Sequence, residues 1–227
     1  GLFLRSEDRS ISDRAQTALL VLGSERAVQV LAARLERDED EAGAQVAARV
    51  RIAAALGETG HAAAIEPLAA CLTDDSSELR NAAFAAALEL TERAMPALDH
   101  SKELPGGLDD EDESSKPPRR DGALLVRFLR RAVTVKDVAI RQRAAEVLDQ
   151  LGAAAAITGA TVGTEAVTAT AELLLSLFTD RQLPVQQAAV LGYSRLVIAG
   201  LATVEPLLGV LRAGTRELLL PAAEGAA

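Results

Sequence analysis

The sequence contains two histidines, His61 and His100, the first residues to consider for metal binding or acid–base chemistry. Neither lies in a His-x-x-x-His or His-Glu pattern, so they do not complete a zinc or di-iron ligand set. Ser101 follows His100, but neighbouring residues on a helix point in different directions, and the strand-turn-helix elbow that exposes a nucleophilic serine is missing. The sequence therefore predicts no metal site and no catalytic residue, and we expect a protein that is not an enzyme.

Phosphate and calcium chemistry require other patterns, and these are also missing. Lys102, Lys116 and Lys136 follow Ser, Ser and Val, so the chain has no Gly-Lys dipeptide of a phosphate-binding loop. The acidic run 109–113 lacks the glycine of an EF-hand loop and has Arg120 where the bidentate glutamate would stand. We therefore predict no cofactor, and no small-molecule substrate can be identified.

Arginines recur near the starts of successive predicted helices, with aspartates close by, and two interpretations are open. The arginines form an anion-binding row, or each guanidinium bridges to a carboxylate or a helix-end carbonyl of a neighbouring unit. We favour the bridging role because lysine is nearly absent from these positions. The residues concerned are Arg14, Arg49, Arg51, Arg80 and Arg141, with Asp13, Asp75 and Asp137.

The elements that carry these arginines are predicted to be paired helices, most clearly over residues 48–90. Apolar residues repeat there with the 3.6-residue period of a helix. Gly57 is expected to end the first helix, and Ser76 or Ser77 to cap a helix over 77–92. One face of the first helix carries Val46, Val50 and Ala53, and one face of its partner carries Ile65, Leu68 and Leu72.

The same spacing returns along the chain, which predicts about five helical hairpins and a final half repeat. A repeat that cannot bury its apolar face alone stacks on its neighbours, so the fold class is an all-α solenoid, a single domain over 1–227. Pro184 is expected near a helix start, and Gly200 at that helix's end. The returning stripes are Val28/Leu31/Leu35, Ala171/Leu174/Phe178 and Val204/Leu207/Leu211.

One segment interrupts the repeats, the insertion over 94–121. It contains paired glycines and prolines together with five consecutive acidic residues, so we expect it to be partly disordered. The loop 105–120 is interpreted as a solvated spacer. An alternative is a tether or switch, in which Ser114 and Ser115 are open to phosphorylation.

Composition limits the classes of partner. A formal net charge of −9 and an aromatic content of 2% argue against nucleic acid, because a phosphate backbone requires a basic surface. The stretch 151–178, interrupted by glycines and glutamates, does not supply the ~18 to 20 apolar residues of a membrane span. The one cysteine, Cys71, is expected to be a small buried apolar residue, and a cytoplasmic location is predicted.

The segment from Arg49 to Gly57, followed by Gly60, Ala64, Glu66-Pro67-Leu68 and Leu72, resembles the short HEAT repeats of phycobilisome-lyase-like proteins. Weaker copies begin near Arg14, Arg141 and Gln186, while Gln186 and Leu218 stand where the family has arginine. The resemblance implies a right-handed superhelix of antiparallel helix pairs and a role in binding other proteins. It does not extend to the HEAT-like deoxyhypusine hydroxylases, which require His-Glu pairs.

Three functions are compatible with parts of these observations, and we compare them. The first is a non-enzymatic scaffold or adaptor that binds another protein as part of a larger complex, through helices such as those containing Val28, Ile65 and Val204. The second, implied by the resemblance, is a bilin-lyase-like subunit that guides a chromophore or a substrate protein. The third, a HEAT-like DNA-repair glycosylase, requires a basic and aromatic concave face that this composition does not supply.

Overall fold

The computed structural model describes residues 25–35, 44–93, 122–158 and 164–226, and within these ranges every regular element is helical. The predicted insertion, Arg14, Asp13 and His100 lie outside them. Contacts divide the chain into two compact units, one with residues 1–71 and 76–121 and one with residues 72–75 and 122–227. The all-α fold class is confirmed, whereas the single domain over 1–227 stays a prediction.

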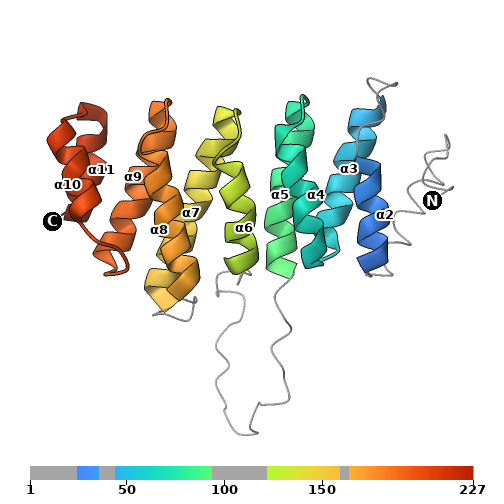
Figure 1. Cartoon of the computed structure of the whole chain (residues 1–227), viewed down its shortest axis with the longest axis horizontal. Coiled ribbons are helices and arrows are strands. Elements are labelled where there is room, and N and C mark those ends of the chain that lie inside the picture. The colour runs from blue at the N-terminus through green and yellow to red at the C-terminus, as the bar shows by residue number, and fades with distance from the viewer. Residues whose placement is uncertain (1–24, 36–43, 94–121, 159–163, 227) are drawn as a thin grey trace, which may run out of the picture. The chain divides into compact units, whose positions relative to one another are not determined.

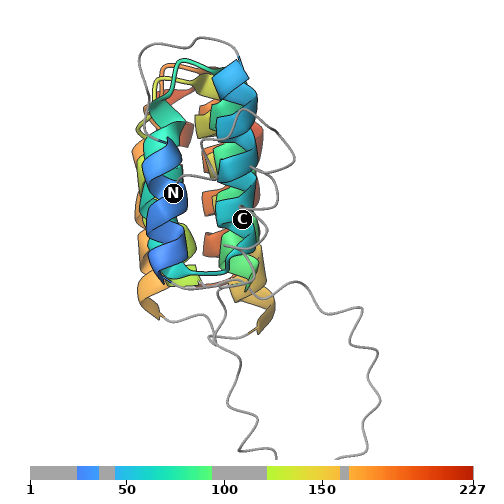
Figure 2. The ribbon, with the colours of Figure 1, turned by 90° about the vertical axis from the view of Figure 1, so that its right-hand side faces the viewer.

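In the first unit consecutive helices are antiparallel, and α3 packs both on α2, which is antiparallel to it, and on α5, which is parallel to it (Figures 1 and 2). Short connections between consecutive helices require this antiparallel order. The helices are α2 (Glu25–Leu35), α3 (Ala44–Glu58), α4 (Ile65–Ala70) and α5 (Ser77–Arg93), with the 3-10 turn η2 (Ala62–Ala64) before α4. The 3-10 turn η3 (Cys71–Thr73) follows α4, and only its first residue is assigned to this unit.

The second unit, described by itself, has the same pattern, with α9 packed on α7, α8 and α11 (Figure 1). Its helices are α6 (Gly122–Ala132), α7 (Val138–Thr158), α8 (Thr164–Leu177), α9 (Leu183–Ile198), α10 (Glu205–Ala213) and α11 (Arg216–Ala226). Each unit is therefore a stack of antiparallel helix pairs, the α-solenoid arrangement that the sequence predicts.

The predicted stripes account for part of the core. Val28, Leu31 and Leu35 are 2%, 0% and 4% exposed, and Ile65, Leu68 and Leu72 are 1%, 0% and 1% exposed, which confirms both stripes. The other three stripes each bury only one member fully, and their remaining residues are half-buried. Those fully buried residues are Ala53, Leu174 and Leu207.

Gly57 does not end a helix, which corrects the sequence-based prediction. It lies inside α3, where a Cβ atom would come within 2.7 Å of the carbonyl oxygen of Ala86 on α5. The glycine therefore permits close packing of α3 on α5. The chain reverses instead at Gly60, whose φ of 62° lies in the left-handed region.

The remaining predicted helix ends agree with the structure. Ser76 accepts a hydrogen bond at Oγ from the backbone N–H of Leu79 at 3.3 Å, so Ser76 caps α5. Pro184 lies in the first turn of α9, where its missing N–H costs no helical bond. Gly200, with a φ of 70°, follows the end of that helix.

A proline inside α11 removes one backbone hydrogen bond of that helix, and a side chain of α9 donates to the carbonyl that is left. Pro221 has no N–H to donate to the carbonyl of Glu217, four residues earlier. The side chain of Gln187 donates to that carbonyl at 3.3 Å, and the Ser194 hydroxyl donates to the carbonyl of Pro221 at 2.5 Å. Both donors come from α9, so these side chains hold the final half repeat against its neighbour.

Candidate functional site

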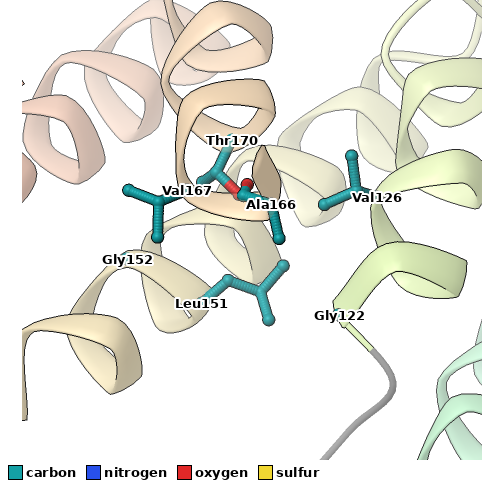
Figure 3. A pocket seen from close by; sticks show the side chains of 7 residues that line it. All are labelled: Gly122, Val126, Leu151, Gly152, Ala166, Val167 and Thr170. Atoms are coloured by element: carbon teal, nitrogen blue, oxygen red, sulfur yellow. The ribbon is translucent and has the colours of Figure 1, made fainter. Parts of the chain in front are cut away.

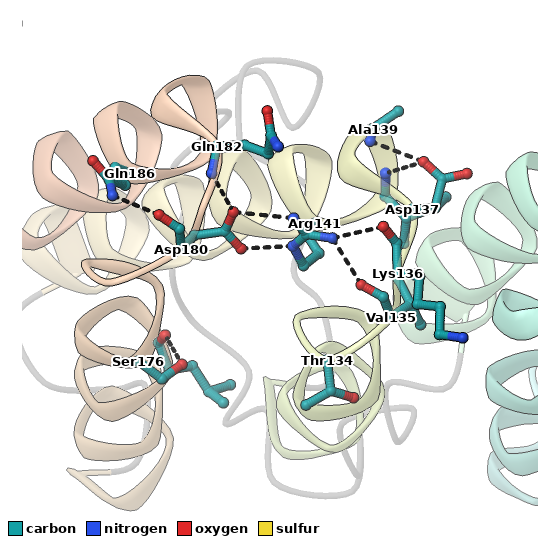
Figure 4. A network of polar contacts seen from close by, with 12 residues as sticks. Thr134, Val135, Lys136, Asp137, Ala139, Arg141, Ser176, Asp180, Gln182 and Gln186 are labelled. Carbon is teal, nitrogen blue, oxygen red and sulfur yellow. Dashed lines mark hydrogen bonds and ion pairs between the residues drawn. The ribbon is translucent and has the colours of Figure 1, made fainter.

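A polar cluster of the second unit surrounds Arg141, at the start of α7 (Figure 4). The Arg141 Nε and NH2 atoms donate to the two carboxylate oxygens of Asp180 at 2.6 and 3.0 Å. Its NH1 atom donates to the carbonyls of Val135 and Lys136 at 2.9 and 2.8 Å. The guanidinium is therefore engaged within the protein and is not directed toward an external anion.

Asp180 lies in the connection between α8 and α9, so this ion pair links two successive repeats. Its Oδ1 atom also accepts from the backbone N–H of Gln182 at 2.8 Å, and its carbonyl accepts from the side chain of Gln186 at 2.5 Å. The hydrogen bond from Arg141 lowers the pKa of the Asp180 carboxyl below its ordinary value. The charged form is thus the one that the fold stabilises.

The favoured interpretation of the arginine row is confirmed at two positions. The Arg49 Nε atom donates to the carbonyl of Leu35, at the end of α2, at 2.9 Å, and Arg141 pairs with Asp180. Arg51 and Arg80 are half-buried. The predicted neighbour Asp137 has a different role, because its Oδ1 accepts from the backbone N–H of Ala139 at 2.9 Å and caps α7.

Sequence reasoning missed Asp180, although a signal was present. Asp180 precedes Gln186 by six residues, just as Asp74 precedes Arg80 by six, and Gln186 and Arg80 occupy the same repeat position. The structure also changes the repeat position to which Leu218 is assigned. It is the third residue of α11 and 5% exposed, as Leu79 is the third residue of α5 and 0% exposed, so Leu218 matches this buried leucine and not an arginine.

A second ion pair joins α7 to α9, and it is less complete. Arg195 NH1 donates to Asp149 Oδ2, and the side chains are 47% and 15% exposed. The other oxygen, Asp149 Oδ1, is buried and accepts no hydrogen bond from the described residues. Burial raises the pKa of the Asp149 carboxyl, and the Arg195 charge only partly offsets this shift.

One small pocket lies among α6, α7 and α8 of the second unit (Figure 3). Its volume of about 10 Å³ accommodates one water molecule and not a substrate. The one polar side chain among its lining residues, Thr170, donates its hydroxyl to the carbonyl of Ala166 at 2.8 Å. The lining consists of Gly122, Val126, Leu151, Gly152, Ala166, Val167 and Thr170.

His61 lies directly before the 3-10 turn η2. Its Nδ1 atom accepts from the backbone N–H of Ala63 at 3.3 Å and caps η2. Cys71 is 5% exposed, which confirms its predicted burial. Among the described residues, no three His, Cys, Asp or Glu side chains are grouped as a metal site requires. Within the same ranges, no helix is long and apolar enough to cross a bilayer.

The solvent-facing side of three helices repeats one pattern. Aligned on the stripes 65/68/72, 171/174/178 and 204/207/211, each of these segments exposes a glutamate, then a small residue four positions later, then a threonine or an arginine three positions further on. The three sets are Glu66/Ala70/Thr73 on α4 and η3, Glu172/Ser176/Thr179 on and just after α8, and Glu205/Gly209/Arg212 on α10. We refer to these three sets as the outer-face positions.

Together, the antiparallel helix pairs, the buried stripes and the arginine links define a protein built from helical-hairpin repeats. Residues 48–74 match the family model of the PBS lyase HEAT-like repeat, which confirms the resemblance for that segment. No curated protein matches the chain.

Solved structures with similar folds include two engineered proteins and a natural complex. The engineered proteins are 16% and 19% identical, with TM-scores of 0.42 and 0.45; each match covers 99% of this chain, and 92% and 55% of theirs. The complex of CpcE and CpcF of phycocyanin lyase from Nostoc is 20% identical, with a TM-score of 0.33, and the match covers 99% of this chain and 91% of that one. These TM-scores are below 0.5, so no conclusion about function follows from the three structures.

Proposed function

We propose that the protein is a non-enzymatic scaffold that binds another protein through the outer-face positions of α8 and α10 in the second unit; α4 in the first unit carries the same pattern. The observation that supports this most strongly is that each of these helices buries one side in the core and exposes the opposite side. Leu68, Leu174 and Leu207 are each 0% exposed, while the outer-face positions of the same helices are exposed. The fold therefore uses one side of each helix, and the other side is available to a partner.

The chemistry of the outer-face positions suits a shallow protein interface. The central residue is small in all three sets, so a partner's backbone or side chain can come close to the helix. The glutamate on one flank supplies a fixed negative charge that favours a basic partner surface, and the residue on the other flank is threonine in two sets and arginine in the third. Repeat proteins spread affinity over many such contacts.

Site-specific photocrosslinking tests this proposal. A photoreactive amino acid is placed at Ser176, on the outer face of α8, or at Gln150, an exposed position on α7, and cross-linked products are compared after irradiation in cells. We expect a protein adduct from Ser176 that Glu172→Lys weakens, and no such adduct from Gln150. Adducts from Gln150 alone, or an adduct at Ser176 unaffected by the charge reversal, would contradict the proposal.

A second candidate function rests on the family match at residues 48–74. The name of that family refers to a PBS lyase. A subunit that guides a chromophore or a substrate protein is therefore an alternative. Purified protein that carries bilin absorbance would favour this alternative. A colourless protein that still forms the Ser176 adduct would favour the scaffold.

A further inference from the structure

The glycines inside helices α3, α7 and α9 have a structural reason, and Gly209 in α10 has none within the described residues. A Cβ atom at Gly57, Gly152 or Gly192 would come within 2.7, 2.8 or 3.0 Å of a neighbouring helix. At Gly209 a Cβ atom would meet nothing within 4 Å, and its φ is not in the left-handed region. Glycine weakens a helix relative to alanine, so an unneeded glycine indicates close approach by a group outside this fold.

The residues around Gly209 form one exposed face of α10. Glu205, Leu208, Gly209 and Arg212 are spaced i, i+3, i+4 and i+7, which places them on the same side of a helix. Leu208 is half-buried and the other three are exposed. An acidic residue thus stands at one end of this face, a basic residue at the other, and a glycine beside a partly exposed leucine in the middle. We call these four residues the α10 face.

This charge arrangement is self-complementary. When two copies of α10 pack antiparallel about a two-fold axis near Gly209, Glu205 of each copy lies opposite Arg212 of the other. The two ion pairs then flank a centre in which glycine allows the helices to approach and Leu208 is covered. The helix dipoles are antiparallel in this arrangement, which is also favourable.

We propose that the α10 face is a homodimer contact in which two copies of this chain pack α10 against α10 with antiparallel, two-fold geometry. The α10 face includes the outer-face positions of α10, so the dimer and the partner proposed above compete for this helix, whereas only the partner uses α8. The contact covers one face of a nine-residue helix, so it is small and we expect a weak, reversible dimer whose formation decreases at high salt. In Figure 1, α10 lies with α11 at the C-terminal end of the second unit.

Reciprocal charge reversals test this geometry, with sedimentation velocity of the full chain from micromolar to millimolar concentration as the readout. Glu205→Arg alone and Arg212→Glu alone each replace two attractive pairs by two repulsive pairs, so each should raise the dimer Kd about tenfold or more. Mixing the two single variants restores opposite charges at both ends, so the mixture should dimerise as well as the original protein does. The double variant should also dimerise normally.

Two further variants separate docking from folding. Gly209→Leu meets open space in the single chain, so the thermal stability should be kept while the dimer is lost. Glu172→Arg reverses the equivalent charge on α8, and it should leave the dimer unchanged. A chain that is monomeric at millimolar concentration, or a dimer that the reversals at Glu205 and Arg212 do not change, would overturn the proposal. A monomer whose α10 face cross-links to a different protein would overturn it too, and would assign the face to that partner.

Discussion

Asp180 and Asp149 are two aspartates of the second unit that pair with arginines, yet the surroundings shift their pKa values in opposite directions. Asp180 accepts two hydrogen bonds from Arg141 and one from the backbone of Gln182, and its pKa is lowered. Asp149 accepts from Arg195 at one oxygen, while the other oxygen is buried and has no hydrogen-bond donor among the described residues, and its pKa is raised. An ion pair alone therefore does not decide which form the fold prefers.

The difference lies in how completely each carboxylate is compensated for the water it loses. Burial of a charged group costs several kcal/mol in proteins. Good hydrogen bonds at both carboxylate oxygens contribute a stabilisation on the order of that cost. Asp180 receives donors at both oxygens, whereas Asp149 is covered by the close approach of α9 at Gly192, with its Cβ atom 3.0 Å from the Cβ position of that glycine. The first pair links repeats, and the second is tolerated because the helices pack closely.

The largest effect is expected from Arg141→Met. This change leaves Asp180 without its two side-chain donors and the carbonyls of Val135 and Lys136 without theirs, while the side chain of Asp180 is only 9% exposed. We expect a loss of about 3 kcal/mol or more in the free energy of unfolding, measured by urea denaturation. A loss below that of Arg195→Met would remove the distinction between the two pairs.

Gly192→Ala tests the cause of the burial of Asp149. The added Cβ would lie 3.0 Å from the Cβ of Asp149 and 3.2 Å from a methyl group of Leu174, so α9 has to move outward. We expect a loss of about 1 to 3 kcal/mol in thermal unfolding experiments. The matched control is Gly209→Ala, which meets open space and should stabilise the chain by up to about 1 kcal/mol. Equal effects of the two substitutions would refute the packing argument.

Arg195→Met should have a smaller effect than Arg141→Met. The side chain of Arg195 is 47% exposed and gives one hydrogen bond to Asp149, so water compensates for much of the lost charge. We expect about 1 kcal/mol of destabilisation at neutral pH, again from urea denaturation. A cost of the size expected for Arg141→Met would mean that Arg195 supports Asp149 more strongly than the geometry indicates.

The pH dependence should show the smallest effects, with opposite signs for the two aspartates. A lowered folded pKa makes Asp180 stabilising above the ordinary aspartate pKa of about 3.9, and this contribution is lost as the pH falls through the folded pKa. A raised folded pKa means that the contribution of Asp149 is present below about 3.9 and is lost as the pH rises through its folded pKa.

The two asparagine variants make this difference measurable. Relative to the unmodified protein, Asp180→Asn should become less stable as the pH rises from 3 to 7, and Asp149→Asn should become more stable over the same window, by less than about 1 kcal/mol. Unfolding curves recorded across this window give both slopes. Slopes of the same sign would contradict the comparison.

The repeat pattern was accessible from the sequence because helical periodicity and helix-end residues are local signals. The stripes at Val28 and Ile65, the cap at Ser76 and the end of α9 at Gly200 all follow from short-range spacing. The prediction for Gly57 was wrong because a glycine that ends a helix and one that admits a neighbouring helix look alike in sequence. Only the position of Ala86 on α5 distinguishes them.

The polar links were less predictable because their partners are distant in sequence. Asp180 is 39 residues from Arg141, and nothing in the local sequence of Arg141 indicates which repeat supplies its carboxylate. The same holds for the unpartnered oxygen of Asp149, which depends on how closely α9 approaches α7. The outer-face positions could have been found from sequence by aligning the three stripes and comparing the residues between them.

Hydrogen–deuterium exchange on the chain with and without its cross-linked partner tests the scaffold most directly. We predict that the partner slows exchange in α8 over residues 172–177 and in α10, while the exposed side of α7 around Glu146 and Gln150 exchanges as before. Slowed exchange confined to α7 and α9, with α8 and α10 unchanged, would contradict the claim that the outer-face positions bind the partner.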